Sequence, residues 1–245
     1  MKRILVTGAN RGIGLEFTRQ YLRRGDRVFA ACRDPQRASE LYTLQAKYVG
    51  QMTIVPLDVA DQASIGASYR LVAQEVSALD VLINNAGVYN APAAPGQPVI
   101  GDDDAPQTFG VLDFENALAV LRINAIAPAI MTQHYVGLLK GGDNPCVVNI
   151  SSGMGSISDS GGGSYYYGTS KAALNMISRK LAMDLRRTWI TVVAMDPGWV
   201  QTDMGGESAS LTPQTSVRAM VAFIDKLSPA QTGGFYDHSG KMQPW

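Results

Sequence analysis

The stretch Ile4–Gly14, which reads ILVTGANRGIG, decides how this sequence folds. A short apolar run is followed by a glycine-rich loop, and a helical pattern begins at Gly12. A strand–loop–helix unit of this kind presents backbone N–H groups and a helix N-terminus to a pyrophosphate. Gly8 permits the tight turn, Gly12 lets a phosphate approach, and Gly14 lets the helix pack close to the strand. The spacing G-x-x-x-G-x-G differs from the G-x-G-x-x-G fingerprint, so a plain glycine-rich turn is the alternative interpretation.

Outward from this stretch, short β-branched runs alternate with longer helical patterns. The predicted strands are Arg3–Val6, Arg27–Cys32, Met52–Leu57, Asp80–Asn84, Cys146–Ile150 and Ile190–Met195, with a weaker seventh at Gly234–Asp237. The predicted helices are Gly12–Arg24, Pro35–Tyr48, Gln62–Ala78, Phe114–Leu139, Ser164–Arg187 and Pro213–Leu227. Most of these strands are continuous apolar runs, as in parallel sheets that are covered on both faces.

This alternation implies right-handed crossovers and a parallel sheet. No repeat or linker divides the chain, so we expect one domain over residues 1–245. The expected fold class is α/β: a doubly wound Rossmann-type domain with a parallel six- to seven-stranded sheet and helices on both faces. Asp34-Pro35 and Thr212-Pro213 each place a capping oxygen before a proline at the first position of a helix.

The composition excludes several classes of protein. Of the 245 residues, 46% are hydrophobic, which argues against disorder. The 21 Lys and Arg residues balance 21 Asp and Glu residues, so the net charge gives no sign of a nucleic-acid partner. The two histidines, His134 and His238, are badly placed for a catalytic triad or a metal cluster, and we expect no metal site.

The expected compartment follows from two apolar segments and from the two cysteines. The stretch Ile4–Val6 is too short for the core of a signal peptide. The apolar run Ala117–Met131 is interrupted by polar residues and a proline, which argues against a membrane span. Cys32 and Cys146 each lie at an end of an apolar run and are expected to be buried reduced thiols rather than a disulfide. We therefore expect a cytoplasmic protein with no membrane partner.

The residues after the second strand bear on the choice of dinucleotide. An acidic residue there suits an unmodified ribose, and a basic residue suits a 2′-phosphate. Asp34 has a suitable distance from Gly14, but an N-cap role before the proline accounts for it as well. Arg33 and Arg11 supply the cations that a 2′-phosphate requires. We therefore expect NADP (NADPH) to be preferred, with NAD as the alternative.

Small and polar residues also follow the third and fourth strands. Asp58 and Val59 come after the third strand, where an adenine contact is expected. Asn84 ends the fourth strand, and the sequence continues with Asn85, Ala86 and Gly87. Open α/β sheets bind ligands beyond the carboxyl ends of their strands, which is where these residues fall. The alternative for the two asparagines is a turn that satisfies its own backbone.

Tyr167 and Lys171 are four residues apart on a predicted helix, so both face the same way. A tyrosine normally titrates near pH 10, and a nearby ammonium favours the phenolate and lowers the pKa. Such a tyrosine can exchange a proton with a carbonyl or an alcohol oxygen. Tyr165 and Tyr166 lack a basic partner at that spacing and are interpreted as wall or packing residues. The Y-x-x-x-K pattern is common on helix surfaces, so it is a weak signal by itself.

Two further polar residues are candidates for the same chemistry. Ser152 ends the fifth strand, where its hydroxyl could stabilise charge on a carbonyl oxygen; a simple serine turn is the alternative. No G-x-S-x-G elbow surrounds it, which argues against a nucleophile. Asn124 lies in an apolar helix, and Pro128 removes the N–H group that its carbonyl would accept. That carbonyl could hold an ordered water for a proton relay, or the helix could simply be kinked around an internally bonded asparagine.

Together these segments resemble the short-chain dehydrogenase/reductase family. The matching segments run through nearly the whole chain, in the order Thr7–Gly14, Asp58, Asn84–Gly87, Asn124, Ser152, Tyr167–Lys171 and Pro197-Gly198. The opening segment Lys2–Gly12 and the closing segments Gly234–Tyr236 and Pro244-Trp245 look like those of the sniffer-type carbonyl reductases and C-factor-like proteins.

The resemblance implies a catalytic tetrad of Asn124, Ser152, Tyr167 and Lys171. In it, Tyr167 is the acid/base, Ser152 positions the carbonyl, Lys171 lowers the tyrosine pKa and bonds the nicotinamide ribose, and Asn124 holds the relay water. Pro197, Gly198 and Thr202 would contact the nicotinamide amide. The complete set of predicted dinucleotide contacts is Gly8, Asn10, Arg11, Gly12, Ile13, Gly14, Arg33, Asp58, Val59, Asn85, Ala86, Gly87, Tyr167, Lys171, Pro197, Gly198, Val200 and Thr202.

The function so implied is NADPH-dependent reduction of an aldehyde or ketone, or the reverse oxidation of an alcohol, with a small-molecule substrate. A dinucleotide-binding signalling or regulatory protein of the C-factor type, with little turnover, is the alternative. The complete tetrad favours an enzyme, because binding alone needs no Tyr–Lys pair. A sugar-nucleotide epimerase would need a longer chain with a substrate domain. The resemblance also implies a homodimer or homotetramer that pairs the helices Phe114–Leu139 and Ser164–Arg187.

Two loops depart from the family pattern. The segment between Ser152 and Tyr167 is longer than is common, and its Ser158–Ser164 part predicts a looser loop over the substrate. The loop Trp199–Leu211 is short for a lid, which predicts an open pocket. The expected walls of that pocket, unless they are ordinary core residues, are Tyr89, Met154 and Trp199.

Overall fold

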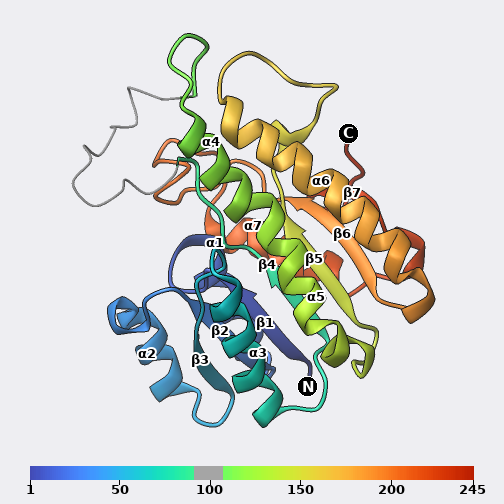
Figure 1. Ribbon diagram of the computed structural model, residues 1–245. Helices are drawn as coiled ribbons and strands as arrows, with labels where there is room; N and C mark the ends of the chain where they lie inside the picture. Colours follow the sequence, from blue (N-terminus) through green and yellow to red (C-terminus); the bar gives the residue numbers. More distant parts are fainter. Residues whose placement is uncertain (91–106) are drawn as a thin grey trace.

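A parallel sheet of seven strands forms the centre of the protein (Figure 1). The computed structural model describes residues 1–90 and 107–245. The strand order is β3-β2-β1-β4-β5-β6-β7, and every neighbouring pair is parallel. The strands are β1 Arg3–Thr7, β2 Arg27–Cys32, β3 Met52–Pro56, β4 Val81–Asn84, β5 Cys146–Ile150, β6 Thr191–Asp196 and β7 Phe235–Asp237. The predicted fold class is confirmed, and the weak seventh strand is part of the sheet.

Helices cover both faces of this sheet. They are α1 Gly12–Arg23, α2 Ser39–Lys47, α3 Gln62–Glu75, α4 Phe114–Leu121, α5 Ala127–Lys140, α6 Tyr165–Leu185 and α7 Pro213–Ile224. One buried apolar cluster joins the sheet to α1, α2 and α7, and a second joins it to α3, α5 and α6. Alternate residues of a strand point to opposite faces, so Ile4 and Val6 pack into the first cluster and Leu5 into the second.

The single long helix predicted over Phe114–Leu139 is wrong in one respect. It is divided by a π-helical turn at Arg122–Ile126 into α4 and α5. In that turn the Ala127 N–H donates to the Arg122 carbonyl, five residues back. Pro128 has no N–H to continue an α-helical pattern, which accounts for the break at this point.

The predicted caps have mixed outcomes. Thr212 accepts a hydrogen bond from the Thr215 N–H at the start of α7, as expected. Asp34 precedes Pro35, but that proline opens a short 3₁₀ turn before α2, and the Asp34 side chain makes no capping bond. The N-cap interpretation of Asp34 is therefore wrong. The exposed carboxylate flanks Arg33 beyond the end of β2.

The apolar segment Phe114–Lys140 is the one described helical run that is long and apolar enough to cross a membrane, with a mean hydropathy of 1.2. Met131, Tyr135 and Leu139 of its second half are buried against the sheet. Such burial is typical of a core helix in a globular domain. The absence of a membrane partner stays a prediction.

Both cysteines are free and buried, as predicted. Burial raises the pKa of the Cys32 thiol to about 11 and that of the Cys146 thiol to about 12. Neither thiol is therefore reactive at neutral pH, because the thiolate is the nucleophile.

Candidate active site

The carboxyl ends of β1 and β4 meet at the point where the strand order reverses, which is where open α/β sheets bind ligands. The Thr7 Oγ1 accepts hydrogen bonds from the Asn85 and Ala86 N–H groups, each at 3.0 Å. The Asn85 Nδ2 donates to the carbonyl oxygens of Thr7 at 2.8 Å and Gly8 at 3.2 Å. The segment after β4 is thereby tied to the predicted phosphate loop.

The glycine loop has the geometry that an anion site needs. Gly8 and Gly12 have φ values of +64° and +52°, which favour glycine. A Cβ on Gly14 would lie 2.2 Å from the Gly8 carbonyl oxygen, so only glycine fits there. Arg11, the N-cap of α1, makes no side-chain cap, and the first turn contains no acidic residue. The first N–H groups of α1 are thus left for a phosphate, and the residues present fit a dinucleotide.

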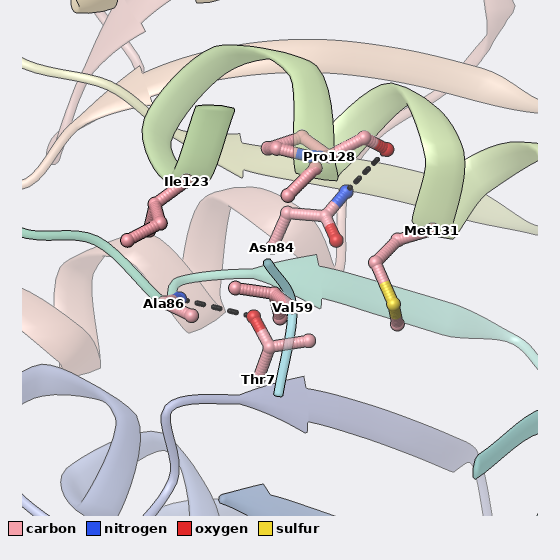
Figure 2. A pocket seen from close by; sticks show the side chains of 8 residues that line it. Thr7, Val59, Asn84, Ala86, Ile123, Pro128 and Met131 are labelled. Carbon is pink, nitrogen blue, oxygen red and sulfur yellow. Dashed lines mark hydrogen bonds between the residues drawn. The ribbon is translucent and has the colours of Figure 1, made fainter. Parts of the chain in front are cut away.

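Figure 2 shows the side chains that line a small pocket at this edge of the sheet. The pocket has no room for a water molecule. Its lining residues are Thr7, Val59, Asn84, Ala86, Ile123, Ala127, Pro128 and Met131. The Asn84 Nδ2 donates to the Asn149 Oδ1 at 2.8 Å and to the Pro128 carbonyl oxygen at 3.4 Å. Asn84 therefore joins β4 to β5 and to the start of α5. For both Asn84 and Asn85, the interpretation of a turn that satisfies its own backbone is wrong.

The two predicted cations differ in their partners. Arg33 is exposed after β2, and its side chain has no ion pair or hydrogen bond within residues 1–90 and 107–245. Arg11 forms an exposed ion pair with Asp203, with a distance of 2.7 Å between Nη1 and Oδ2. An exposed pair of this kind is worth less than about 1 kcal/mol, so a phosphate can displace the carboxylate at little cost.

The other predicted dinucleotide contacts lie around the same sheet edge. The Asp58 carboxylate follows β3 and accepts the Ala60 N–H at 2.9 Å. Asn10 is half-buried in the glycine loop, and Ile13 packs against the core below it. Asp58 thus belongs to the turn after β3, and Asn10 and Ile13 belong to the glycine loop after β1.

The segment after β6 lies against the glycine loop. Gly198 has a φ of +76°, and Val200 forms a parallel bridge with Leu211. The Thr202 Oγ1 accepts the Gly205 N–H, and the Thr202 methyl carbon would lie 3.3 Å from a Cβ on Gly12. Thr202, one of the predicted nicotinamide contacts, is therefore brought next to the predicted phosphate loop.

Lys171 lies at the centre of the predicted tetrad and is only 4% exposed. Its Nζ donates to the Ile150 carbonyl oxygen at 2.8 Å and lies 5.4 Å from the centre of the Tyr167 ring. A Cβ on Gly87 would lie 3.3 Å from the Asn124 Oδ1 and 3.7 Å from the Lys171 Nζ. The structure thus brings the tyrosine, the lysine and the asparagine together beside the segment that follows β4.

Asn124 is held inside the π turn by its side chain. The Oδ1 accepts the Val88 N–H at 2.9 Å, and the Nδ2 donates to the Val88 carbonyl at 2.8 Å and to the Ser170 Oγ at 3.0 Å. Asn124 therefore fixes the chain after β4 to the helix of Tyr167. The water proposed for its main-chain carbonyl stays a prediction.

Ser152 stands at the end of β5 and is half-buried. Its Oγ accepts the Met154 N–H at 3.2 Å, so it caps the short turn Gly153–Gly155. A hydrogen bond between Ser152 and Tyr167 lowers the pKa of the tyrosine. The serine-turn interpretation is therefore confirmed, and the contact of Ser152 with a substrate carbonyl stays a prediction.

The pKa of Tyr167 differs from expectation. Burial raises it to about 12, the hydrogen bond to Ser152 opposes that rise, and the Asp196 charge adds to it. The prediction that Lys171 lowers this pKa is wrong, because burial is the largest effect and raises it, and the Lys171 ammonium donates to the Ile150 carbonyl. Burial also lowers the pKa of Lys171 to about 8, against the effect of Asp196.

Asp196 is a site residue that the sequence analysis missed. It ends β6, and its Oδ1 accepts the Gly198 N–H at 3.0 Å. Its charge raises the pKa of both Tyr167 and Lys171. The available signal was its position, because it is a carboxylate that ends an apolar strand at the same edge of the sheet as Ser152.

The three expected wall residues have different surroundings. The Tyr89 ring lies 5.2 Å from the Tyr167 ring, measured between centroids. The Trp199 indole donates to the Gly205 carbonyl at 2.8 Å and is 56% exposed, and Met154 is also exposed. The predicted loose loop is held at one end, because Ser158 donates through its N–H and its hydroxyl to the Trp245 carbonyl oxygen.

The buried lysine leads to a prediction about stability. The folded chain releases the Lys171 proton near pH 8, and the unfolded chain releases it near the ordinary pKa of 10.5. Between these two pKa values the unfolded state binds more protons than the folded state, so the free energy of unfolding rises with pH. Below pH 8, burial of the ammonium costs about 3 kcal/mol. We expect Lys171→Met to raise the free energy of unfolding at pH 7 by about 1–3 kcal/mol. This net gain allows for the lost hydrogen bond to the Ile150 carbonyl, which offsets part of the benefit.

Urea unfolding of the cofactor-free protein at pH 7 and pH 10 measures this effect. The gain should shrink toward pH 10, and the exposed Lys140→Met should change stability by less than about 0.5 kcal/mol. A destabilised Lys171→Met variant at pH 7 would contradict the assignment of a costly buried charge.

Known proteins are similar to this chain in sequence and in fold. The family model described as short chain dehydrogenase matches residues 2–212. C-signal of Myxococcus xanthus is 40% identical over 168 residues, which are 68% of this chain and 93% of that protein. The NADPH-bound carbonyl reductase from chicken fatty liver is 38% identical, with a TM-score of 0.87, over 100% of this chain and 99% of that chain.

The carbonyl reductase Sniffer of D. melanogaster is 31% identical, with a TM-score of 0.88, over the whole of both chains. The family match spans the glycine loop, both halves of the sheet and the Tyr167–Lys171 helix. The chain therefore belongs to the short-chain dehydrogenase family.

Proposed function

We propose that this protein is an NADPH-dependent carbonyl reductase that acts on an aldehyde or ketone, or on the corresponding alcohol in reverse. The observation that carries the proposal is that buried Lys171 lies beside both Gly87 and the Tyr167 ring, at the sheet edge that holds the glycine loop. The names of two similar structures, both carbonyl reductases and one with NADPH bound, support the same choice.

The proposed proton transfer depends on the protein's own side chains. NADPH, when bound, supplies a hydride to the carbonyl carbon. Tyr167, with a pKa of about 12, is protonated at neutral pH and donates its proton to the carbonyl oxygen. The Ser152 hydroxyl holds that oxygen by a hydrogen bond as its negative charge develops. Lys171, whose pKa burial lowers to about 8, would bond the nicotinamide ribose and hold the dinucleotide beside Tyr167.

The competing function is a dinucleotide-binding regulatory protein with little turnover, which the 40% identity to C-signal favours. Oxidation of NADPH with a panel of aldehydes and ketones separates the two functions. The reductase proposal requires turnover of at least one carbonyl class above the rate without substrate. Tight NADPH binding with no turnover across the panel would support the regulatory function instead.

The choice between NADPH and NADH depends on Arg33. Its exposed guanidinium has no partner within the described residues, so it can pair with a 2′-phosphate. We expect Arg33→Ala to weaken NADPH binding about 10- to 100-fold, which corresponds to one charge-assisted hydrogen bond, and to leave NADH binding nearly unchanged. Fluorescence titration with both dinucleotides measures the ratio.

The control for Arg33→Ala is Arg186→Ala, which removes an exposed arginine at the far end of α6. It should leave both affinities unchanged. Tighter binding of NADH than NADPH by the wild-type protein would overturn the assignment of Arg33 and Arg11.

We further propose that the protein is cytoplasmic and assembles as a homodimer or homotetramer. Cytoplasmic conditions suit its two buried thiols. Assembly would cover apolar side chains that α4 and α6 expose, namely Phe114, Leu118, Met176 and Met183. Light scattering of the purified protein tests the assembly, and a monomer at micromolar concentration would exclude it.

A further inference from the structure

The helix that carries Tyr167 begins without a cap of its own. Its N-cap residue, Ser164, has the left-handed backbone φ +48°, ψ +41° and makes no side-chain cap. The Ser164 hydroxyl is instead hydrogen-bonded to the Tyr89 hydroxyl at 2.6 Å. The first N–H groups of a helix have no partner within the helix, so those of α6 need acceptors from elsewhere.

Gln107, a residue distant in sequence, supplies those acceptors. Its side-chain Oε1 accepts the Tyr167 N–H at 2.7 Å, and its main-chain carbonyl accepts the Tyr165 N–H at 3.2 Å. Gln107 is fully buried, at 0% exposure. It therefore caps the catalytic end of α6 from outside the helix.

The same side chain also holds the aromatic neighbour of Tyr167. The Gln107 Nε2 donates to the Tyr89 carbonyl at 2.7 Å and to the Asn90 Oδ1 at 2.8 Å. Tyr89 in turn packs its ring 5.2 Å from the Tyr167 ring. The Gln107 side-chain amide thus bonds the backbone of both Tyr89 and Tyr167, whose rings are in contact. Its oxygen and its nitrogen both have hydrogen-bond partners.

We propose that Gln107 is a positioning residue for Tyr167. The proposal rests on the proposed function, in which Tyr167 donates the proton. Helix ends fray when their N–H groups lack acceptors, and Tyr167 lies in the first turn of α6. An error of about 1 Å in the placement of a reacting group can cost about 100-fold in rate. Gln107 fixes both the backbone of Tyr167 and the ring that packs against it.

Two variants separate the hydrogen bond that the amide accepts from the two that it donates. Gln107→Met has a similar volume and removes all three. Gln107→Glu keeps an acceptor for the Tyr167 N–H and loses the donor to Tyr89 and Asn90. We expect kcat to fall about 10- to 100-fold in the methionine variant and less in the glutamate variant, with the NADPH affinity within about twofold of wild type.

The control is Thr188→Val at the other end of α6, about 30 Å away along the helix. It removes the 2.6 Å hydrogen bond from the Thr188 hydroxyl to the Leu185 carbonyl. This variant should lower Tm and leave kcat unchanged. A loss of kcat in Gln107→Met no larger than in Thr188→Val would overturn the proposal.

Hydrogen exchange of the cofactor-free protein gives a readout that needs no activity. The Tyr167 amide should exchange faster in Gln107→Met than in wild type, and the Gln107→Glu variant should retain its protection. Unchanged exchange in Gln107→Met would overturn the positioning role, whether or not the wild type reduces carbonyls. A wild type without turnover would overturn the proposed function alone. If the methionine variant does not fold, a loss of kcat in Gln107→Glu no larger than in Thr188→Val would overturn the proposal, because the glutamate has lost the donor to Tyr89 and Asn90.

Discussion

Tyr167→Phe is expected to lower kcat for carbonyl reduction by about 100- to 10,000-fold, the usual contribution of a positioned general acid. The substitution removes only the hydroxyl, so the ring contact with Tyr89 and the fold of α6 should persist. NADPH affinity should change by less than about threefold, because the lost hydroxyl acts in the transition state, when the proton is transferred. Stopped-flow measurement of NADPH oxidation at saturating substrate checks the prediction.

The matched control for this variant is Tyr165→Phe, on the same turn of the same helix. The Tyr165 side chain is 42% exposed and has no role in the proposed proton transfer. Its kcat should equal that of wild type. Equal rates for Tyr167→Phe and Tyr165→Phe with an active substrate would remove Tyr167 from the mechanism.

Gly14→Ala is expected to reduce dinucleotide affinity at least about 100-fold and to destabilise the fold by about 1–3 kcal/mol. The new methyl group would lie 2.2 Å from the Gly8 carbonyl oxygen and 2.5 Å from the Asn85 Nδ2. Relief of this overlap requires α1 to move away from β1, and the N–H groups that face the phosphate move with it. Isothermal titration with NADPH and thermal unfolding measure the two effects.

Gly66→Ala provides the comparison for Gly14→Ala. Gly66 also lies in a helix, but a Cβ there would have no neighbour closer than 3.7 Å. Alanine in an open helical position should stabilise the protein by about 0.5–1 kcal/mol, with NADPH affinity unchanged. Normal NADPH binding by Gly14→Ala would show that the helix can shift without loss of the phosphate site.

The sequence was sufficient to predict the sheet and the residues at its edge, because strong local patterns specify them. Continuous apolar runs predict parallel strands, and the carboxyl ends of such strands share one edge. This rule alone brings the glycine loop, Asn85 and Ser152 together. The four-residue spacing then adds Lys171 to Tyr167 on one face of a helix.

What the sequence did not predict depends on pairs of distant residues. Nothing near Gln107 in the sequence indicates that it caps a helix that begins at Tyr165. Arg11 likewise pairs with Asp203, 192 positions away. The pKa of Tyr167 was predicted in the wrong direction, because residue spacing placed a cation nearby but could not show the extent of burial or the bond from Lys171 to Ile150.

The π turn at Arg122–Ile126 also lets one continuous run of helix pack against two different parts of the molecule. A π turn holds one residue more than an α-turn, so side chains before it are rotated by about 100° relative to an uninterrupted helix. The half after the turn, α5, packs on α3 and β4, and the half before it, α4, packs mainly along α6. The extra residue therefore rotates the contact face of the helix from the sheet toward the helix of Tyr167. Asn124 lies within this turn, where its side chain bonds Val88 and Ser170.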